Sequence, residues 1–224
     1  MKVMILAAGK GERMGELTKK IPKPLIKVRG KPLIEWHLEK LSSTGFKDIV
    51  INVCYLPEMI KEFIGDGSRW KLNVVYSEEN PILETAGGIK NALPLLGFEP
   101  FLVINADIFS NFNYGKLKLI SLNNSIDGYL VLVKNPEHNQ IGDFGLLEDN
   151  FLDLNKGILY TFSGIAVYHP RFFNQLEIGK KMQLLPLLKN SISQHLIKGE
   201  LFEGIWSDIG TPERLEIANK IDLI

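Results

Sequence analysis

Short aliphatic runs that alternate with segments of helical period restrict the fold of this chain more than any other feature. The runs predict strands over residues 2–6, 48–53, 73–76, 101–105, 129–133 and 161–168. The periodic segments predict helices over residues 31–45, 58–64, 88–95, 116–121, 183–195 and from Pro212 onward. Such alternation is typical of βαβ units. We therefore expect an α/β fold, a Rossmann-like, mostly parallel mixed sheet flanked by helices, as one domain over residues 1–224.

Charge and composition exclude several classes of function. Lys plus Arg equals Asp plus Glu at 26 each, so the formal net charge is zero, and no basic surface indicates a nucleic acid partner. The single cysteine, Cys54, cannot form an internal disulfide, and no Cys/His spacing is typical of zinc. Residues 3–8 are too short for a signal peptide, and no apolar run approaches the roughly 20 residues that span a bilayer. We expect a cytoplasmic protein without a membrane partner, a monomer or small homo-oligomer.

A glycine-rich turn follows the first expected strand. In LAAGKGERMG, Ala7 and Ala8 lead into Gly9, Gly11 and Gly15. Small residues let backbone N–H groups approach phosphate oxygens. The spacing is one residue longer than the dinucleotide fingerprint, and no Gly-Lys-Ser/Thr follows as a Walker A motif requires. The turn favours a nucleoside triphosphate over a nicotinamide cofactor, and the alternative is a tight turn without a ligand.

Two cations lie near this turn in the sequence. Arg13 is inside it, and Lys23 follows between Pro22 and Pro24, which restrict the backbone on both sides. The planar fork of arginine suits the β- and γ-phosphates, and a compact lysine charge suits the α-phosphate and an incoming phosphate. The alternative is that both are solvated surface charges.

The segment LAAGKGERMG…IPKPLIKVRGKPLIEWHL resembles the signature of the sugar nucleotidylyltransferases, a G-x-G-x-R loop followed by Pro-Lys-Pro. The similarity continues through SEENPILETAGGI, LVINADI, GDFGL, TFSGIAVYHP and WSDIGTPERL. It implies the fold of the nucleotide-diphospho-sugar transferases, which is similar to glycosyltransferase A. It also implies Mg²⁺ as cofactor and UTP and a sugar 1-phosphate as substrates. GDFGL and TFSGIAV are most similar to members that act on N-acetylmuramic acid 1-phosphate in cell-wall sugar recycling.

The resemblance gives roles to two aspartates and two cations. Asp107 and Asp208 match the positions that hold Mg²⁺, and two carboxylates with phosphate oxygens and waters suit this ion. Arg13, Lys23 and Asp107 are the expected catalytic residues. As alternatives, Asp107 is a turn residue and Asp208 caps the helix that begins at Pro212.

The resemblance also implies the residues that bind the nucleotide and the sugar. The expected nucleotide-binding residues are Leu6, Ala7, Ala8, Gly9, Gly11, Arg13, Lys23, Glu79, Gly87 and Gly88, with Glu79 accepting the N3 proton of uracil. The expected sugar-binding residues are Asn105, Asp143, Gly145 and Ser163. Alternatives are an exposed acidic turn at Glu79, a helix entry at Gly87 and Gly88, a cap at Thr85, and turn chemistry at the sugar-binding residues. The chain has FLDLNKGILY where many members carry Glu-Lys-Pro, so a sugar contact of that glutamate is absent or replaced.

Two other functions fit the same residues. One is a related enzyme with another pair, such as GTP with mannose 1-phosphate, or UTP or dTTP with glucose or N-acetylglucosamine 1-phosphate. The other is a catalytically silent nucleotide-sugar sensor, because a fold does not fix a function. Retention of Arg13, Lys23, Asp107 and Asp208 together favours an enzyme over a sensor.

Overall fold

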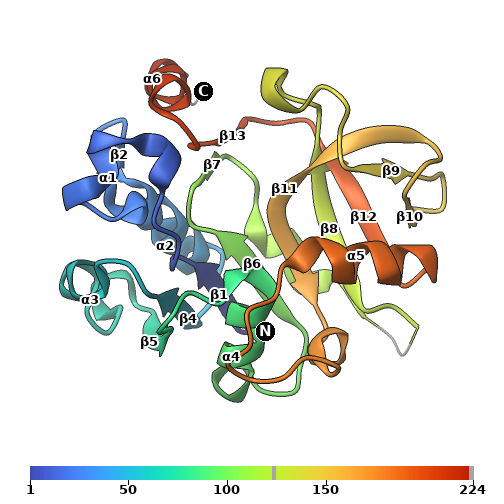
Figure 1. The fold of residues 1–224 in the computed structure, drawn as a ribbon, viewed down its shortest axis with the longest axis horizontal. Coiled ribbons are helices and arrows are strands. Elements are labelled where there is room, and N and C mark those ends of the chain that lie inside the picture. Colours follow the sequence, from blue (N-terminus) through green and yellow to red (C-terminus); the bar gives the residue numbers. More distant parts are fainter. Residues whose placement is uncertain (123–124, 222–224) are drawn as a thin grey trace.

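The computed structural model describes residues 1–122 and 125–221, so five residues of the expected domain lie outside it. In the described residues a nine-stranded mixed sheet forms the centre of the molecule (Figure 1). Four strands are parallel, in the order β5 (Asn73–Glu78), β4 (Asp48–Val53), β1 (Val3–Leu6) and β6 (Phe101–Asn105). The long β11 (Ile158–Tyr168) is antiparallel to β6 and joins it to the rest of the sheet.

The other part of the sheet is mixed in direction. A bulge between Phe162 and Ile165 divides β11 into two parts. On one edge both parts pair with the same strand, whereas on the other edge the part after the bulge pairs with β6 and the part before it pairs with a different strand. These neighbours and their partners are β8 (Gly128–Val133), β9 (Phe144–Leu146), β10 (Leu152–Asp153) and β12 (Ile197–Phe202). Gly164, in the bulge, has φ +77, a conformation that glycine adopts without strain. The bulge lets one strand serve both sheet parts.

Helices cover both faces of the parallel strands, because successive strand residues point to opposite sides. Ile5, Ile51 and Ile104 pack on one face against α2 (Leu33–Ser43) and α3 (Pro57–Ile64). On the other face, Met4 and Val103 pack with α4 (Glu84–Leu96) and α5 (Leu184–Ser193). All these strand side chains are buried, and each stabilises the fold by about 1.5–3 kcal/mol.

The chain order creates a crevice at the carboxyl ends of β1 and β6. From β1 the chain passes through α2 to β4 on one side, and it later returns through α4 to β6 on the other side. Strands on the two sides of such a switch point are followed by loops that diverge, and ligands of open α/β sheets bind there. The fold alone therefore predicts a ligand site among the residues that follow Leu6 and Asn105.

Shorter elements surround this crevice. After β1 come η1 (Glu12–Met14), α1 (Glu16–Lys20), η2 (Lys23–Leu25), β2 (Lys27–Val28) and β3 (Lys31–Pro32). A two-stranded ribbon of β7 (Ile108–Ser110) and β13 (Trp206–Asp208) leads into α6 (Pro212–Lys220). Met14, Phe109 and Ile209 share a small core that joins the loop after β1 to this ribbon. Residues nearly 200 positions apart are thereby fixed together.

The predicted α/β class, with a mostly parallel mixed sheet and flanking helices, is confirmed. Two helix predictions differ from the structure by more than a shift of one or two residues at an end. α4 begins at Glu84 and not at Gly88, because the Met182 carbonyl accepts hydrogen bonds from the N–H groups of Ala86 and Gly87 and holds the first turn. Thr85 therefore lies within the helix. The helix expected over 116–121 is a 3₁₀ turn, η4 (Tyr114–Leu119).

The remaining short elements are η3 (Ser68–Trp70), η5 (Glu137–Asn139) and η6 (Pro170–Phe173). Among the described residues, no helix has the length and apolar character needed to cross a membrane.

Candidate active site

A cleft of about 660 Å³ opens at the carboxyl ends of β1, β4, β5 and β6. Ten of the residues expected to bind ligands line it: Leu6, Ala7, Ala8, Gly9, Gly11, Arg13, Lys23, Glu79, Asn105 and Asp107. Lys10, Glu12, Pro24, Asn52, Ile82, Glu84, Thr85, Ala106, Lys181 and Gly210 complete the lining. Gly87, Gly88, Asp143, Gly145, Ser163 and Asp208 do not line this cleft. The structure thus gathers the phosphate-binding and catalytic candidates and leaves the expected sugar contacts, apart from Asn105, outside.

The loop after β1 is shaped by Gly11. Its φ of +68 is in the left-handed region, and a Cβ there would lie 3.0 Å from the Thr18 side chain and 3.1 Å from that of Lys23. The Gly11 carbonyl accepts hydrogen bonds from the Met14 N–H at 2.9 Å and the Thr18 hydroxyl at 3.0 Å. Arg13 is exposed at the cleft and makes no ion pair with a described residue. The loop is held from behind and presents backbone and a free guanidinium to the cleft.

A buried chain of hydrogen bonds fixes the floor of the cleft. The Ala7 N–H donates to Asn52 Oδ1 at 2.8 Å, and Asn52 Nδ2 donates to Glu79 Oε1 at 2.7 Å. Glu79 Oε2 accepts from the Leu83 N–H at 2.8 Å. Asn52 and Glu79 are 3% and 5% exposed, so an exposed acidic turn at Glu79 is wrong. Glu79 ties the ends of β4 and β5 to the start of α4.

Gly87 and Gly88 have close packing neighbours. A Cβ on Gly88 would lie 2.4 Å from Glu79 Oε1 and 2.9 Å from Asn52 Nδ2. A Cβ on Gly87 would lie 2.4 Å from the Lys180 carbonyl oxygen, and the Gly87 N–H already donates to Met182. Both glycines are inside α4, not at its entry. Their small size lets the helix pack against the buried Asn52–Glu79 pair and against residues 180–182.

Lys23 and Asp107 form an ion pair in the cleft although they are 84 positions apart. Lys23 begins η2 after Pro22, whose φ of −65 sets the direction of entry, and Asp107 lies between β6 and β7. The lysine side chain is 11% exposed and the aspartate 28%. A lysine amine held here is available to a phosphate in the cleft.

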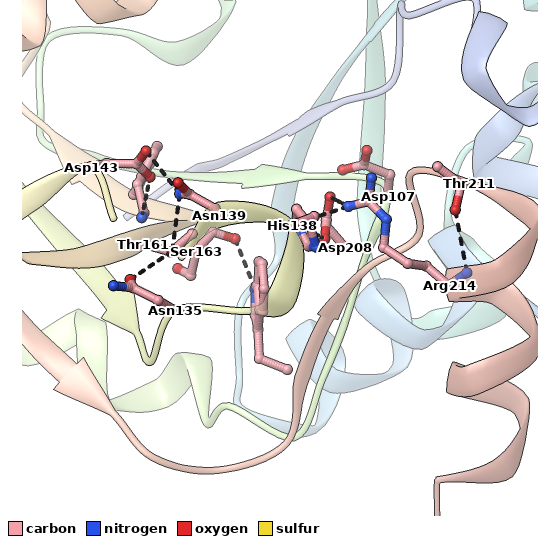
Figure 2. Close-up of polar contacts among 12 residues, drawn as sticks. Asp107, Asn135, His138, Asn139, Asp143, Thr161, Ser163, Asp208, Thr211 and Arg214 are labelled. Carbon is pink, nitrogen blue, oxygen red and sulfur yellow. Dashed lines mark hydrogen bonds and ion pairs between the residues drawn. The ribbon is translucent and has the colours of Figure 1, made fainter. Parts of the chain in front are cut away.

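The ribbon of β7 and β13 places Asp208 beside the segment that carries Asp107. Asp208 pairs with Ile108, and the Ile209 N–H donates to the Asp107 carbonyl at 2.8 Å. Arg214 of α6 forms an ion pair with Asp208 Oδ2, and His138 Nε2 lies 3.1 Å from Asp208 Oδ1 (Figure 2). Asp208 does not cap α6. The N-cap is Thr211, whose side chain accepts from the Arg214 N–H.

The side chains of two predicted sugar-binding residues already have partners in the protein. Asp143 accepts from the Asn139 amide at 3.0 Å and from the Phe162 N–H at 2.8 Å, so it fastens the loop before β9 to β11 (Figure 2). The Ser163 hydroxyl, buried in the bulge, donates to the Val131 carbonyl at 2.6 Å.

The other two predicted sugar-binding residues differ in their surroundings. A Cβ on Gly145 would lie 1.7 Å from the Lys156 carbonyl oxygen. Asn105 lines the cleft, and its side-chain amide has no hydrogen-bond partner among the described residues. It therefore has free donors and an acceptor for a ligand.

Behind the Asp107 segment lies a buried group on α2. His37 Nδ1 is 2.8 Å from the Tyr114 hydroxyl, and burial lowers the pKa of His37 to about 3. Lys40 donates to the Ser110 carbonyl, and burial lowers its pKa to about 8. Neutral His37 packs beneath β7 and has no catalytic assignment.

The residues present fit a divalent cation that is completed by substrate. Asp107 and Asp208 supply hard carboxylate oxygens from neighbouring backbone positions. Among the described residues no group of three or more His, Cys, Asp or Glu could hold a metal by itself. The remaining ligands would have to be phosphate oxygens and water, as expected of a magnesium site that works on a triphosphate.

Fold and cleft together define an α/β enzyme that binds a nucleotide at the switch point of its sheet. Residues 2–163 match the family model for nucleotidyl transferase. The chain belongs to this nucleotidyl transferase family, and it is a sugar-phosphate nucleotidyltransferase, as the sequence predicts. Enzymes of this family generally use a divalent cation.

Two sequence relatives are similar to nearly the whole of this chain. An N-acetylmuramate alpha-1-phosphate uridylyltransferase of Neisseria meningitidis is 46% identical, over 99% of this chain and 98% of its own length. A mannose-1-phosphate guanyltransferase of Hypocrea jecorina is 27% identical, over 95% of this chain and 62% of its own length.

Two solved structures share the fold. One, described as a glucose-1-phosphate thymidylyltransferase from Bacillus anthracis, superposes with a TM-score of 0.86 at 19% identity, covering 100% of this chain and 97% of its own. HddC from Yersinia pseudotuberculosis, complexed with GMP-PN, gives 0.79 at 25% identity over 98% of each chain.

Four of the residues that the sequence did not predict have side chains that bear on the site. Asn52 lies next to the end of an apolar strand, and a polar side chain in IVINV was a usable signal. Arg214 pairs with Asp208 six positions before it, within the segment WSDIGTPERL, which was a usable signal. His138 approaches Asp208 from a distant segment, and Lys181 reaches the cleft from the segment that packs on α4. Nothing local in the sequence marks His138 or Lys181.

Proposed function

We propose that the enzyme transfers the uridylyl group of UTP to N-acetylmuramic acid α-1-phosphate, giving the UDP-sugar and pyrophosphate. The observation that carries the proposal is the cleft in which the loop after β1, Arg13 and the Lys23–Asp107 pair converge. The 46% identity to a uridylyltransferase acting on this sugar phosphate supports the choice of substrates. The described chain would work as one domain, in cell-wall sugar recycling.

The loop after β1 is proposed to bind the triphosphate. Leu6 to Gly11 line an open, polar cleft, and the small residues of the loop allow phosphate oxygens to approach its backbone. Arg13 has no competing ion partner among the described residues, and its guanidinium suits the β- and γ-phosphates. Glu79 borders the cleft, where its oxygens retain lone pairs for the N3 proton of uracil beside the two hydrogen bonds they accept.

The reaction we propose is a single in-line displacement. An oxygen of the sugar 1-phosphate forms a bond to the α-phosphorus of UTP, and the bond from that phosphorus to the β-phosphate bridging oxygen breaks. Pyrophosphate carries away the electron pair of the broken bond. Lys23 neutralises the charge of the reacting phosphates, and Arg13 stabilises the pyrophosphate that forms.

Mg²⁺ is the cation we propose for the family's divalent site. Asp107 and Asp208 would hold it, and it would supply charge neutralisation between the phosphate groups. Lys23 would then turn from Asp107 toward the phosphates, since one amine cannot serve both at full strength. A loss of metal-dependent turnover in Asp107→Asn with an intact fold supports this assignment.

The sugar is proposed to lie beside Asn105, whose free amide faces the cleft. Asp143, Gly145 and Ser163 are retained as proposed contacts, with their present hydrogen bonds and packing shaping the loop around the sugar. The sequence FLDLNKGILY, without Glu-Lys-Pro, agrees with an acceptor that differs from glucose-type sugars.

The decisive experiment measures pyrophosphate release with Mg²⁺ over a grid of substrates. ATP, CTP, GTP, UTP and dTTP are each combined with the 1-phosphates of N-acetylmuramic acid, N-acetylglucosamine, glucose and mannose. We expect one strong response, with UTP and the muramic acid phosphate. A response elsewhere moves the substrate to that of a related enzyme. Silence throughout, with retained binding of UDP-sugar, would make the protein a sensor.

The cellular setting follows from the substrates. A reaction that consumes UTP and one unpaired cysteine, Cys54, favour the cytoplasm. We propose a monomer or small homo-oligomer, which sedimentation at micromolar concentration would distinguish.

A further inference from the structure

Each of the two carboxylates proposed to hold the metal ion forms an ion pair with a positively charged side chain of the protein. Lys23 pairs with Asp107, and Arg214 pairs with Asp208. The side chains of Arg214 and Asp208 are 15% and 23% exposed, so most of this pair is removed from water. A charged group in such surroundings destabilises the fold unless it is paired with an opposite charge. The site is therefore charge-balanced before any substrate or metal arrives.

The two oxygens of Asp208 differ in their surroundings. Oδ2 accepts from Arg214 Nη1, whereas Oδ1 is buried, lies 3.1 Å from His138 Nε2 and has no hydrogen-bond partner among the described residues. His138 Nε2 also lies 3.0 Å from Arg214 Nη1, so the three side chains form one cluster (Figure 2). Oδ1 has a free lone pair for a cation, but ligation through Oδ2 as well requires Arg214 to leave that oxygen. The Arg214 guanidinium, which donates to Oδ2, therefore competes with a cation for this oxygen.

Arg214 also lies against the wall of the cleft. A Cβ on Gly210 would lie 2.7 Å from Arg214 Nη2 and 2.8 Å from Cζ, and Gly210 lines the cleft. Its own backbone is fixed in the first turn of α6, where Thr211 caps its N–H. Rotation of the Arg214 side chain would therefore carry the guanidinium from Asp208 along the cleft wall at Gly210, towards a phosphate bound in the cleft.

We propose that Arg214 is a positioning residue that exchanges partners. In the metal-free enzyme it holds Asp208 and competes with the divalent cation. When Asp208 becomes a metal ligand, Arg214 moves to a phosphate oxygen of the bound substrate. The exchange couples the two binding events. The cation displaces Arg214 from Asp208, and the phosphate accepts the displaced guanidinium, so each ligand raises the affinity for the other. This inference rests on the proposed function, since it takes Asp208 as a ligand of the cation.

Two carboxylates with water bind Mn²⁺ only weakly, so this binding is measured by electron paramagnetic resonance at high metal concentration without nucleotide, which tests the competition independently of turnover. Arg214→Gln should bind Mn²⁺ about threefold to tenfold more tightly than the natural enzyme, the gain expected from removing one part-buried ion pair. Arg214→Lys, which keeps the charge, should stay near the natural value. The matched control Arg69→Gln removes another arginine–carboxylate pair, with Glu35 at 2.7 Å, and should leave Mn²⁺ affinity unchanged.

The outcomes separate this inference from the proposed function. If Asp208→Asn leaves Mn²⁺ affinity unchanged, the metal assignment fails and the exchange fails with it. If Asp208→Asn weakens binding but Arg214→Gln does not strengthen it, the exchange alone is overturned. A crystal structure of the natural enzyme with Mn²⁺ and UTP requires no variant: Arg214 should contact a phosphate, and an intact Arg214–Asp208 pair beside bound metal would refute the exchange.

Discussion

Replacement of Asn52 by alanine should destabilise the fold and disturb nucleotide binding together. Asn52 bridges the Ala7 N–H and Glu79 Oε1, both through buried hydrogen bonds of 2.8 and 2.7 Å. Alanine leaves both groups without this partner, and a buried unsatisfied polar group costs about 1–3 kcal/mol. We therefore expect a loss of about 2–4 kcal/mol in the free energy of unfolding. For a chain of this length the Tm would fall by about 5–15 °C.

The functional part of the prediction concerns the loop that begins at Ala7. Without Asn52 this loop loses its anchor to β4, so the KM for UTP should rise more than kcat falls. Urea unfolding followed by circular dichroism gives the stability, and pyrophosphate release gives the kinetics. The matched control is Asn91→Ala, whose amide makes only 3.3 Å hydrogen bonds to Ser77 and Glu78 and whose loss should cost within about 0.5 kcal/mol.

A double-mutant cycle with Glu79→Gln isolates the network. Because Asn52 and Glu79 contact each other, their effects should couple by about 0.5–3 kcal/mol. A loss below about 0.5 kcal/mol for Asn52→Ala, or strictly additive effects in the cycle, would refute the reasoning. A change in preference between UTP and CTP in Glu79→Gln, beyond its effect on stability, would support the base contact proposed for Glu79.

Three further predictions address catalysis, pH and packing. Lys23→Ala and Asp107→Asn should each lower kcat by about 10²–10³-fold, as removal of comparable electrostatic groups does, and near-normal pyrophosphate release by either would contradict the mechanism. Burial lowers the pKa of His37 to about 3. The unfolded chain therefore binds a proton that the fold excludes, and stability from this residue is lost as pH falls from about 6.5 towards 3. His37→Gln should show a shallower acid slope of unfolding free energy, and an unchanged slope would count against this. Gly145→Ala should cost about 1–3 kcal/mol by crowding the backbone, and unaltered urea stability would show that the strand adapts freely.

The sequence by itself determined the parallel part of the sheet and the candidate phosphate loop. β4 and β6 have the bounds that their aliphatic runs predict, and Pro212 opens α6 as expected. These features are local: a buried strand is apolar along its own length, and a turn that admits phosphate needs small residues in sequence. The loop after β1 and Lys23 could be found for the same reason.

Tertiary structure decided what the polar side chains do. The three-residue strands β7 and β13 carry no periodic signal, yet their pairing sets Asp208 beside the Asp107 segment. Glu79, which by its neighbours in sequence could be an exposed acid, is buried because Asn52 and the start of α4 meet it. The partner of a charged side chain depends on which distant segments pack together, and only the tertiary structure shows that Lys23 pairs with Asp107 and that His138 lies beside Asp208.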